Sequence, residues 1–245
     1  MARDKNLLDG VVKFISTEGW VDELQQRLQA HTVPAVAERN LPEAELVRLL
    51  DQQVYAMMFT CVVEDLMSRT LPDGRNLTDA YLKRHGWKLG STARRQLEAV
   101  RDSRMGLYEV DAVTPGVGLT LRNLLAEDEK IPVEAEALAR ALPVGCPLGA
   151  RVLRADGKVS LTGGILPFEE GMSAEAAAAV AEVEDRAAGI TVFWLRKTLE
   201  EQLGKVEGRP GALPLDPTGD KSPDPIYEGA DAGDGDATSE VRAPE

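Results

Sequence analysis

The chain has 245 residues, 43% hydrophobic and 28% charged, which is typical of a globular protein with a sizeable core. Its formal net charge of −13 argues against a general nucleic-acid binder. Only two histidines and two cysteines are present, and Cys61 and Cys146 lack the spacing and the nearby histidines of a zinc site. We therefore expect no metal, no cofactor and no disulfide framework.

Neither a targeting segment nor a membrane segment is predicted. The first residues are polar and lead into an amphipathic stretch, so we expect no secretory signal. No stretch approaches the ~20 consecutive apolar residues that cross a bilayer as a helix. We expect a cytoplasmic protein that does not engage a membrane.

Residues 1–105 predict a helical domain. Apolar side chains recur at helical spacing over 7–15 and again over 21–28, on either side of Gly19. The spacing predicts two short amphipathic helices joined at that glycine.

The longest predicted helix comes next in the chain. Asn40 is its expected cap, and its apolar positions continue to Leu66, which makes it the expected central packing element. The Pro-Asp-Gly sequence within 71–75 predicts the turn that ends it. Asn76 and Ser91 are the expected caps of two further helices.

Residues 106–168 predict a small β domain. The expected strands cover 107–113, 119–124, 131–135, 150–154 and 158–162. The dipeptide Asp156-Gly157 is a strong signal of a tight hairpin, because a type I′ turn needs positive φ at both central positions. Five short strands cannot cover both faces of an open sheet, so we expect a barrel-like sheet and an α+β fold.

The C-terminal part predicts a returning helix and a tail. Ser173 is the expected cap of an alanine-rich helix that reaches Leu203 and packs on the N-terminal helices, within a segment spanning 169–205. Residues 206–245 hold ten acids against three bases, a balance of −7, and contain few large apolar side chains. Such a composition predicts a disordered acidic tail.

Four stretches carry a resemblance to a known family. They are the apolar helix from Phe59 to Asp65, the turn LPDGRNL at 71–77, LYEV at 107–110 and GKVSLTGG at 157–164. Their order resembles uncharacterised bacterial proteins related to the SEC-C zinc-motif-containing family. The resemblance implies a C-terminal zinc module, but the C-terminal segment here has no cysteine and cannot form it. No site residues are therefore carried over.

A basic segment stands out from the acidic chain. Residues 77–104 hold seven lysines and arginines against three acids, a balance of +4, with two aromatic side chains among them. Cations interleaved with aromatic rings are typical of contacts to phosphates and stacked bases. The candidate anion- or nucleic-acid-binding residues are Tyr81, Lys83, Arg84, Trp87, Lys88, Arg94, Arg95 and Arg101. A basic helical face paired with acidic neighbours is the alternative interpretation.

No catalytic residue is predicted. The glycines at 116–118 and 163–164 lack the remaining residues of phosphate-binding loops, and no serine and histidine form a recognisable nucleophile arrangement. We expect a non-catalytic binding or regulatory protein with an unidentified protein partner. Nucleic-acid binding through residues 81–104 is the first alternative, and a hydrolase with an unrecognised carboxylate site is the second.

Overall fold

The computed structural model describes residues 2–126 and 129–207, and the predicted acidic tail lies outside these residues from position 208 onward. The helices are α1 (Ala2–Thr17), α2 (Val21–Ala37), α3 (Glu43–Leu49), α4 (Gln52–Ser68), α5 (Leu77–His85), the 3₁₀ turn η1 (Gly86–Lys88), α6 (Ser91–Asp102), α7 (Glu136–Ala141), α8 (Ser173–Val180) and α9 (Arg186–Glu207). The strands are β1 (Met105–Thr114), β2 (Gly118–Asn123), β3 (Lys130–Glu134), β4 (Pro147–Ala155), β5 (Lys158–Leu161) and β6 (Leu166–Pro167). The predicted α+β class is confirmed.

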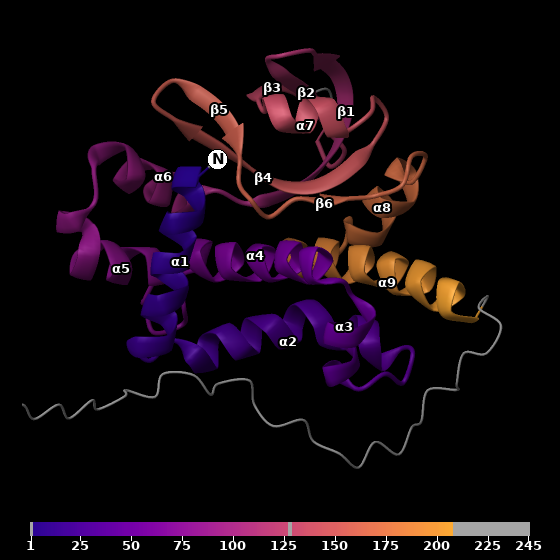
Figure 1. Ribbon diagram of the computed structural model, residues 1–245, viewed down its shortest axis with the longest axis horizontal. Helices are drawn as coiled ribbons and strands as arrows, with labels where there is room; N and C mark the ends of the chain where they lie inside the picture. Colours follow the sequence, from indigo (N-terminus) through magenta and orange to yellow (C-terminus); the bar gives the residue numbers. More distant parts are fainter. Residues whose placement is uncertain (1, 127–128, 208–245) are drawn as a thin grey trace, which may run out of the picture. The chain divides into compact units, whose positions relative to one another are not determined.

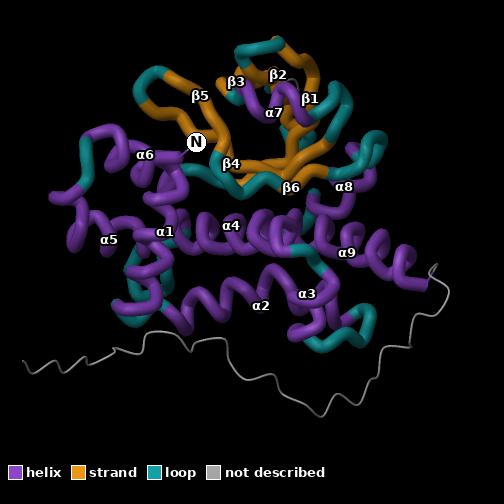
Figure 2. Tube along the Cα trace, in the orientation of Figure 1, coloured by secondary structure: helices purple, strands orange, loops and turns teal. Residues whose placement is uncertain are grey.

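The helices and strands form layers within one compact unit. Figure 1 shows the strands above a middle layer of α4 and α9, with α2 and α3 below that layer. Figure 2 shows the strands gathered on one side of the middle layer, with the short helix α7 among them. The predicted return of the last helix is confirmed, because α9 packs along α2 and also contacts α4.

The start of the helical part follows the sequence pattern, and its middle departs from it. Gly19 separates α1 from α2 with a φ of 74°. The single helix expected from Asn40 to Leu66 is wrong, since the chain forms α3 and α4 instead. The break lies at Asp51, whose side chain accepts a hydrogen bond of 2.8 Å from the backbone N–H of Val54 and so caps a new helix.

Of the three other expected caps, one is confirmed and two differ from the structure. Asn76 caps α5 as predicted, accepting from the backbone N–H of Asp79 at 2.9 Å. Ser91 is instead the first residue of α6, and the cap position belongs to Gly90. Ser173 contacts Glu109 rather than capping, and the helix expected there divides into α8 and α9.

The strands form the expected barrel-like sheet. Its order is β3-β2-β1-β4-β5, so β1 to β4 have the spatial order of a Greek key. The β1 strand pairs with β4 through its first half and with β2 through its second, and a register shift lies between Val110 and Ala112. The edge strands β3 and β5 lie side by side, and an ion pair of 2.8 Å between Lys158 and Glu134 joins them.

The two ends of the barrel differ. Its core is filled by apolar side chains from β1 to β4, and Leu138 in α7 and Leu142 directly after α7 pack against this core. Because α7 follows the end of β3, it lies at the end of the barrel where β3 finishes and β4 begins. Both β1 and β3 are antiparallel to β2, and β4 is antiparallel to β1. The first residues of β1 and β3 and the last residues of β4 therefore meet at the opposite end.

The tight turn between β4 and β5 generates a stability prediction. Asp156 and Gly157 have φ values of 54° and 74°, as a type I′ turn requires. A Cβ at Gly157 would meet nothing within 4 Å, so the cost of Gly157→Ala is that of the left-handed backbone alone. We expect a loss of about 1–2 kcal/mol in the free energy of unfolding, measured by urea denaturation.

The matched control for this substitution is Gly90→Ala. Gly90 has an ordinary extended backbone, with φ −65° and ψ 159°, and a Cβ there also meets open space. Ala caps a helix less well than Gly but also lowers the entropy of the unfolded chain, and because these two effects oppose each other we expect a net change within about 0.5 kcal/mol. Equal effects of the two substitutions would contradict the role assigned to the turn.

Candidate functional site

The basic segment forms α5, η1 and α6, and most of its predicted site residues are exposed. Lys83, Arg84, Trp87, Lys88, Arg94 and Arg95 are exposed, and Arg101 is half-buried. Trp87 is 75% exposed, while the other two tryptophans, Trp20 and Trp194, are 3% and 4% exposed. The ammonium of Lys88 lies 5.0 Å from the centroid of the Trp87 ring, within the range of a cation–π contact.

Tyr81 is the exception among the predicted site residues. Its side chain is buried and meets the Phe14 ring edge-on, with 5.4 Å between the ring centroids, and the His85 ring at 5.2 Å. Burial raises the pKa of the Tyr81 hydroxyl. The structure therefore gives Tyr81 a packing role between α1 and α5 and leaves Trp87 as the exposed ring of the segment.

The predicted cations divide into paired and unpaired groups. Arg101 binds Asp79 and Asp102 at 2.7 and 2.8 Å, Arg95 pairs with Asp156, and Arg84 lies 3.9 Å from Glu18. Among the side chains that the structure describes, no carboxylate forms an ion pair with the remaining three, which are Lys83, Lys88 and Arg94.

The unpaired cations lie on the segments that adjoin Trp87. Lys83 is in the last turn of α5, four residues before Trp87, and Lys88 follows Trp87 directly in η1. The Arg94 guanidinium lies over Gly86, where a Cβ would come within 3.1 Å of Nη2. We call Lys83, Trp87, Lys88 and Arg94 the Trp87 face.

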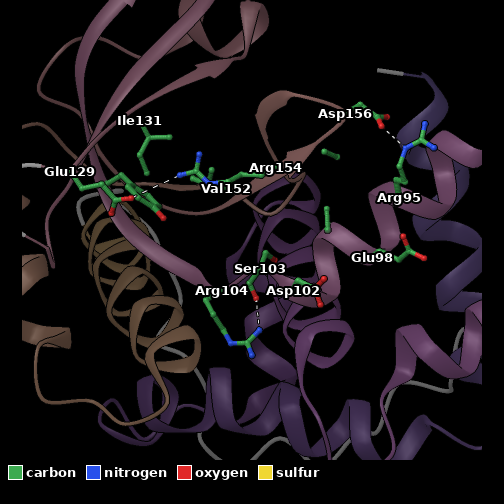
Figure 3. A pocket seen from close by; sticks show the side chains of 13 residues that line it. Arg95, Glu98, Asp102, Ser103, Arg104, Glu129, Ile131, Val152, Arg154 and Asp156 are labelled. Carbon is green, nitrogen blue, oxygen red and sulfur yellow. Dashed lines mark hydrogen bonds and ion pairs between the residues drawn. The ribbon is translucent and has the colours of Figure 1, made fainter.

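A second feature was not predicted from the sequence. A cleft of about 590 Å³ lies between α6 and the barrel end opposite α7. The barrel contributes Tyr108, Ile131 and Val152 to it, from β1, β3 and β4. In Figure 3, Arg154 reaches toward Glu129 on the barrel side, across from Glu98 on α6.

Seven charged side chains line this cleft, and the fold already pairs most of them. They are Arg95, Arg104, Arg154, Glu98, Asp102, Glu129 and Asp156. Asp156 pairs with Arg95 and Asp102 with Arg101, whose guanidinium lowers the pKa of Asp102. Glu129 accepts a hydrogen bond of 2.8 Å from the Asn123 side chain, and its carboxylate lies 4.0 Å from the Arg154 guanidinium.

Two charged residues of the cleft are left over. Among the described residues, Glu98 has no cationic partner. Arg104 forms no ion pair with a carboxylate of the described residues, although its charge helps to lower the pKa of Asp102, and its Nη1 donates to the backbone carbonyls of Ser103, Arg101 and Ser68 at 2.8, 3.4 and 3.5 Å. Neither Glu98 nor Arg104 is therefore held in an ion pair on the wall that α6 and the residues after it form.

The Tyr108 side chain adds a polar group to the apolar wall. It is 7% exposed, and its hydroxyl forms no hydrogen bond within the described part of the chain. A Cβ at Gly106 would lie 2.5 Å from this hydroxyl oxygen, so the glycine leaves the space that the ring occupies. Burial, with a smaller contribution from the charge of Glu129, raises the pKa of Tyr108 and keeps the hydroxyl protonated.

A buried ionic cluster lies behind the cleft wall. Asp65 in α4 accepts from Arg27 at 2.8 Å, from Arg151 at 3.2 Å and from Arg69 at 3.3 Å, and lies 3.3 Å from His31 Nε2. Arg27 and Arg69 also bind Asp185 at 2.8 and 3.0 Å. This Asp65 cluster, made of these six residues, joins α2, α4, β4 and the residue before α9.

The environment of the Asp65 cluster lowers the pKa values of both Asp65 and His31. Burial alone would raise the pKa of Asp65, but the hydrogen bond with His31 and the charge of Arg27 hold it well below its ordinary value. Burial lowers the pKa of His31, although Asp65 acts against this. The folded protein therefore keeps Asp65 ionised and favours neutral His31.

Glu64 and the cysteines are buried away from these surfaces. Burial raises the pKa of Glu64, whose oxygens accept from the Thr162 hydroxyl at 2.8 Å and the Gly164 N–H at 3.2 Å. Cys61 and Cys146 are buried free thiols. The described residues contain no group of three or more His, Cys, Asp or Glu placed to hold a metal ion, and no helix among them is long and apolar enough to cross a membrane.

Comparison with known proteins gives no relative for this chain. No protein-family model, no curated protein and no solved structure matches it. The resemblance to SEC-C-related proteins therefore stays a prediction.

The Asp65 cluster generates a prediction about pH. We expect the free energy of unfolding to fall as pH drops from about 7 to about 5, because unfolded histidine takes up a proton near 6.5 while folded His31 resists it. A further loss is expected below about pH 4, since an unfolded aspartate is protonated there and folded Asp65 is not. Urea denaturation midpoints at several pH values measure both.

The control for this prediction is His31→Gln, which removes the titrating ring and keeps a polar amide. We expect this variant to lose the change between pH 7 and 5 and to keep the change below pH 4. If wild type and variant respond equally between pH 7 and 5, His31 is not the source of the pH dependence.

Proposed function

We propose that this chain is a non-catalytic binding protein that takes single-stranded nucleic acid on the Trp87 face. The observation that carries the proposal is Trp87, a ring 75% exposed with the Lys88 ammonium 5.0 Å from its centroid, on a face whose three cations have no carboxylate partner among the described side chains. An exposed tryptophan leaves an apolar ring in water, where a base can stack on it. Unpaired cations on the same face supply contacts for phosphates.

The chemistry of this face favours single strands over duplexes. Each unpaired base presents a π-face to an aromatic side chain, and such stacking contributes about 1–3 kcal/mol per base. A duplex hides those faces within its own stack. The net charge of −13 opposes long-range attraction, so we expect weak binding that is sensitive to salt.

The strand arrangement agrees with this proposal without carrying it. A five-stranded, partly open Greek-key barrel is the architecture of the OB-fold, and OB-folds commonly bind oligonucleotides or oligosaccharides. A fold alone does not give a function. The argument therefore rests on the side chains of the Trp87 face.

The two other expected functions receive less support. An unidentified protein partner would be favoured by a continuous apolar patch, but the exposed large apolar side chains of the described residues, such as Val47, Val117 and Val144, lie on separate elements. A hydrolase needs a carboxyl group poised to give up a proton. Burial raises the pKa of the Glu64 carboxyl group in this way, but Glu64 does not line the cleft.

The test is a fluorescence-anisotropy titration with a labelled single-stranded oligonucleotide at low salt. We expect Trp87→Ala to weaken binding about tenfold, because a stacked base is lost. Arg94→Gln should weaken binding and reduce the slope of log affinity against log salt by about 0.7, the value for one phosphate contact to a single strand. Quenching of tryptophan fluorescence by the oligonucleotide should disappear in the Trp87 variant, because Trp20 and Trp194 are buried.

The matched control is Arg48→Gln, since Arg48 is an exposed arginine on α3, outside the Trp87 face. It should leave both affinity and salt slope nearly unchanged. Equal affinity of the wild type and Trp87→Ala for the single strand would remove the proposal. Equal loss in Arg48→Gln and Arg94→Gln would show binding by overall charge alone.

A further inference from the structure

The cleft beside α6 presents two opposite charges that the fold does not use. Glu98 and Arg104 both line it, and among the described residues neither has an oppositely charged partner. Arg104 retains guanidinium hydrogens beyond those of Nη1, and a free carboxylate is the group that accepts two of them at once. Glu98 is a matching acceptor for an ammonium group. The helical wall can therefore bind a negative and a positive group together.

The remaining charges of the cleft argue against a highly charged ligand. The lining has three arginines and four carboxylates, so it has nearly equal charge of both signs. A nucleotide or another multiply charged anion would meet as many carboxylates as arginines. A molecule with one charge of each sign and no net charge fits this balance best.

The barrel wall supplies the complementary apolar surface. Tyr108, Ile131 and Val152 form it, and the hydroxyl of the largely buried Tyr108 side chain has no hydrogen-bond partner in the described part of the chain. A ligand in the cleft can supply that partner. The volume of about 590 Å³ falls within the range of ligand pockets, which often occupy the mouths of barrels.

We propose that this cleft is a second binding site and that its ligand is a zwitterion of amino-acid or dipeptide size with an apolar side chain. The ligand ammonium binds Glu98, its carboxylate binds Arg104, and its side chain packs on the barrel wall. The Tyr108 hydroxyl donates to a ligand oxygen. This inference is independent of nucleic-acid binding, because no residue of the Trp87 face lines the cleft.

The spacing of the two charged residues distinguishes the two sizes of ligand. The four positions from Glu98 to the last residue of α6, Asp102, correspond to roughly 6 Å along the helix axis, and the chain then continues through the extended Ser103 to Arg104. The termini of a dipeptide are separated by about 7 Å when it is extended, whereas those of a free amino acid are much closer. We therefore expect the dipeptide to bind more tightly.

The test is isothermal titration calorimetry of the full chain with four probes. They are leucine, leucyl-leucine, N-acetyl-leucyl-leucine, which lacks the ammonium, and leucyl-leucine amide, which lacks the carboxylate. Each blocked dipeptide should bind the wild type about tenfold more weakly than leucyl-leucine, as expected for one lost charge-assisted contact. Leucine binding more tightly than leucyl-leucine would keep the zwitterion site and assign it to a free amino acid.

The variants assign each ligand group to a residue. Glu98→Gln should bind the acetylated and free dipeptides equally, and Arg104→Gln should bind the amidated and free dipeptides equally. Tyr108→Phe keeps the ring and breaks no hydrogen bond to a described residue, so it provides a folded variant with an expected loss of about threefold. Arg94→Gln lies outside the cleft and should bind leucyl-leucine as the wild type does.

Two results would overturn the proposal. One is the absence of saturable binding of both leucine and leucyl-leucine up to about 10 mM. The other is an equal penalty for N-acetylation in the wild type and in Glu98→Gln. Neither result bears on the oligonucleotide titration, so this proposal and that of the Trp87 face fail separately.

Discussion

The carboxylate of Asp65 is the contact point on which the arrangement of helices and barrel depends. Three arginines and a histidine from α2, β4 and the end of α4 converge on it. Burying several ions costs several kcal/mol for each, and this cost is offset only when every charge has close partners and additional hydrogen bonds. The elements that supply those partners can therefore adopt few other relative positions. Asp185 extends the same constraint to the start of α9.

Arg151 transmits this constraint to the walls of the cleft. It is 1% exposed, and besides Asp65 it binds the Ser68 hydroxyl at 3.0 Å and the Ser103 carbonyl at 3.4 Å. Ser103 directly follows α6, and Arg151 lies three residues before Arg154 in β4. The helical and barrel walls of the cleft are thus tied to one buried guanidinium. A site on rigid elements that are held in this way is better defined than a site on loops.

The strands and several turns could be predicted because they depend on neighbouring residues. Contacts between residues far apart in the sequence could not be predicted. The Asp156-Gly157 turn and the Asn76 cap depend on residues within three positions of each other, and the structure has both. Asp65 and Arg151 are 86 positions apart, and no periodicity indicates that they meet. The sequence also marked Tyr81 and Trp87 as equivalent aromatic residues, although only their place around the helix decides which one is buried. The cleft was missed for the same reason, since its walls come from four separate elements.

The position of α6 explains how an acidic chain offers two surfaces of different chemistry. Leu97 is buried against the helical core and fixes the rotation of the helix about its axis. Arg94 then lies over Gly86 beside the exposed tryptophan, while Arg95 and Glu98 line the cleft. Consecutive residues on a helix point about 100° apart, so adjacent arginines serve different surfaces. The two surfaces differ in the charges that the fold leaves without an ion pair among the described side chains: three cations on the Trp87 face, and one charge of each sign in the cleft. The net charge of the whole chain does not describe either surface.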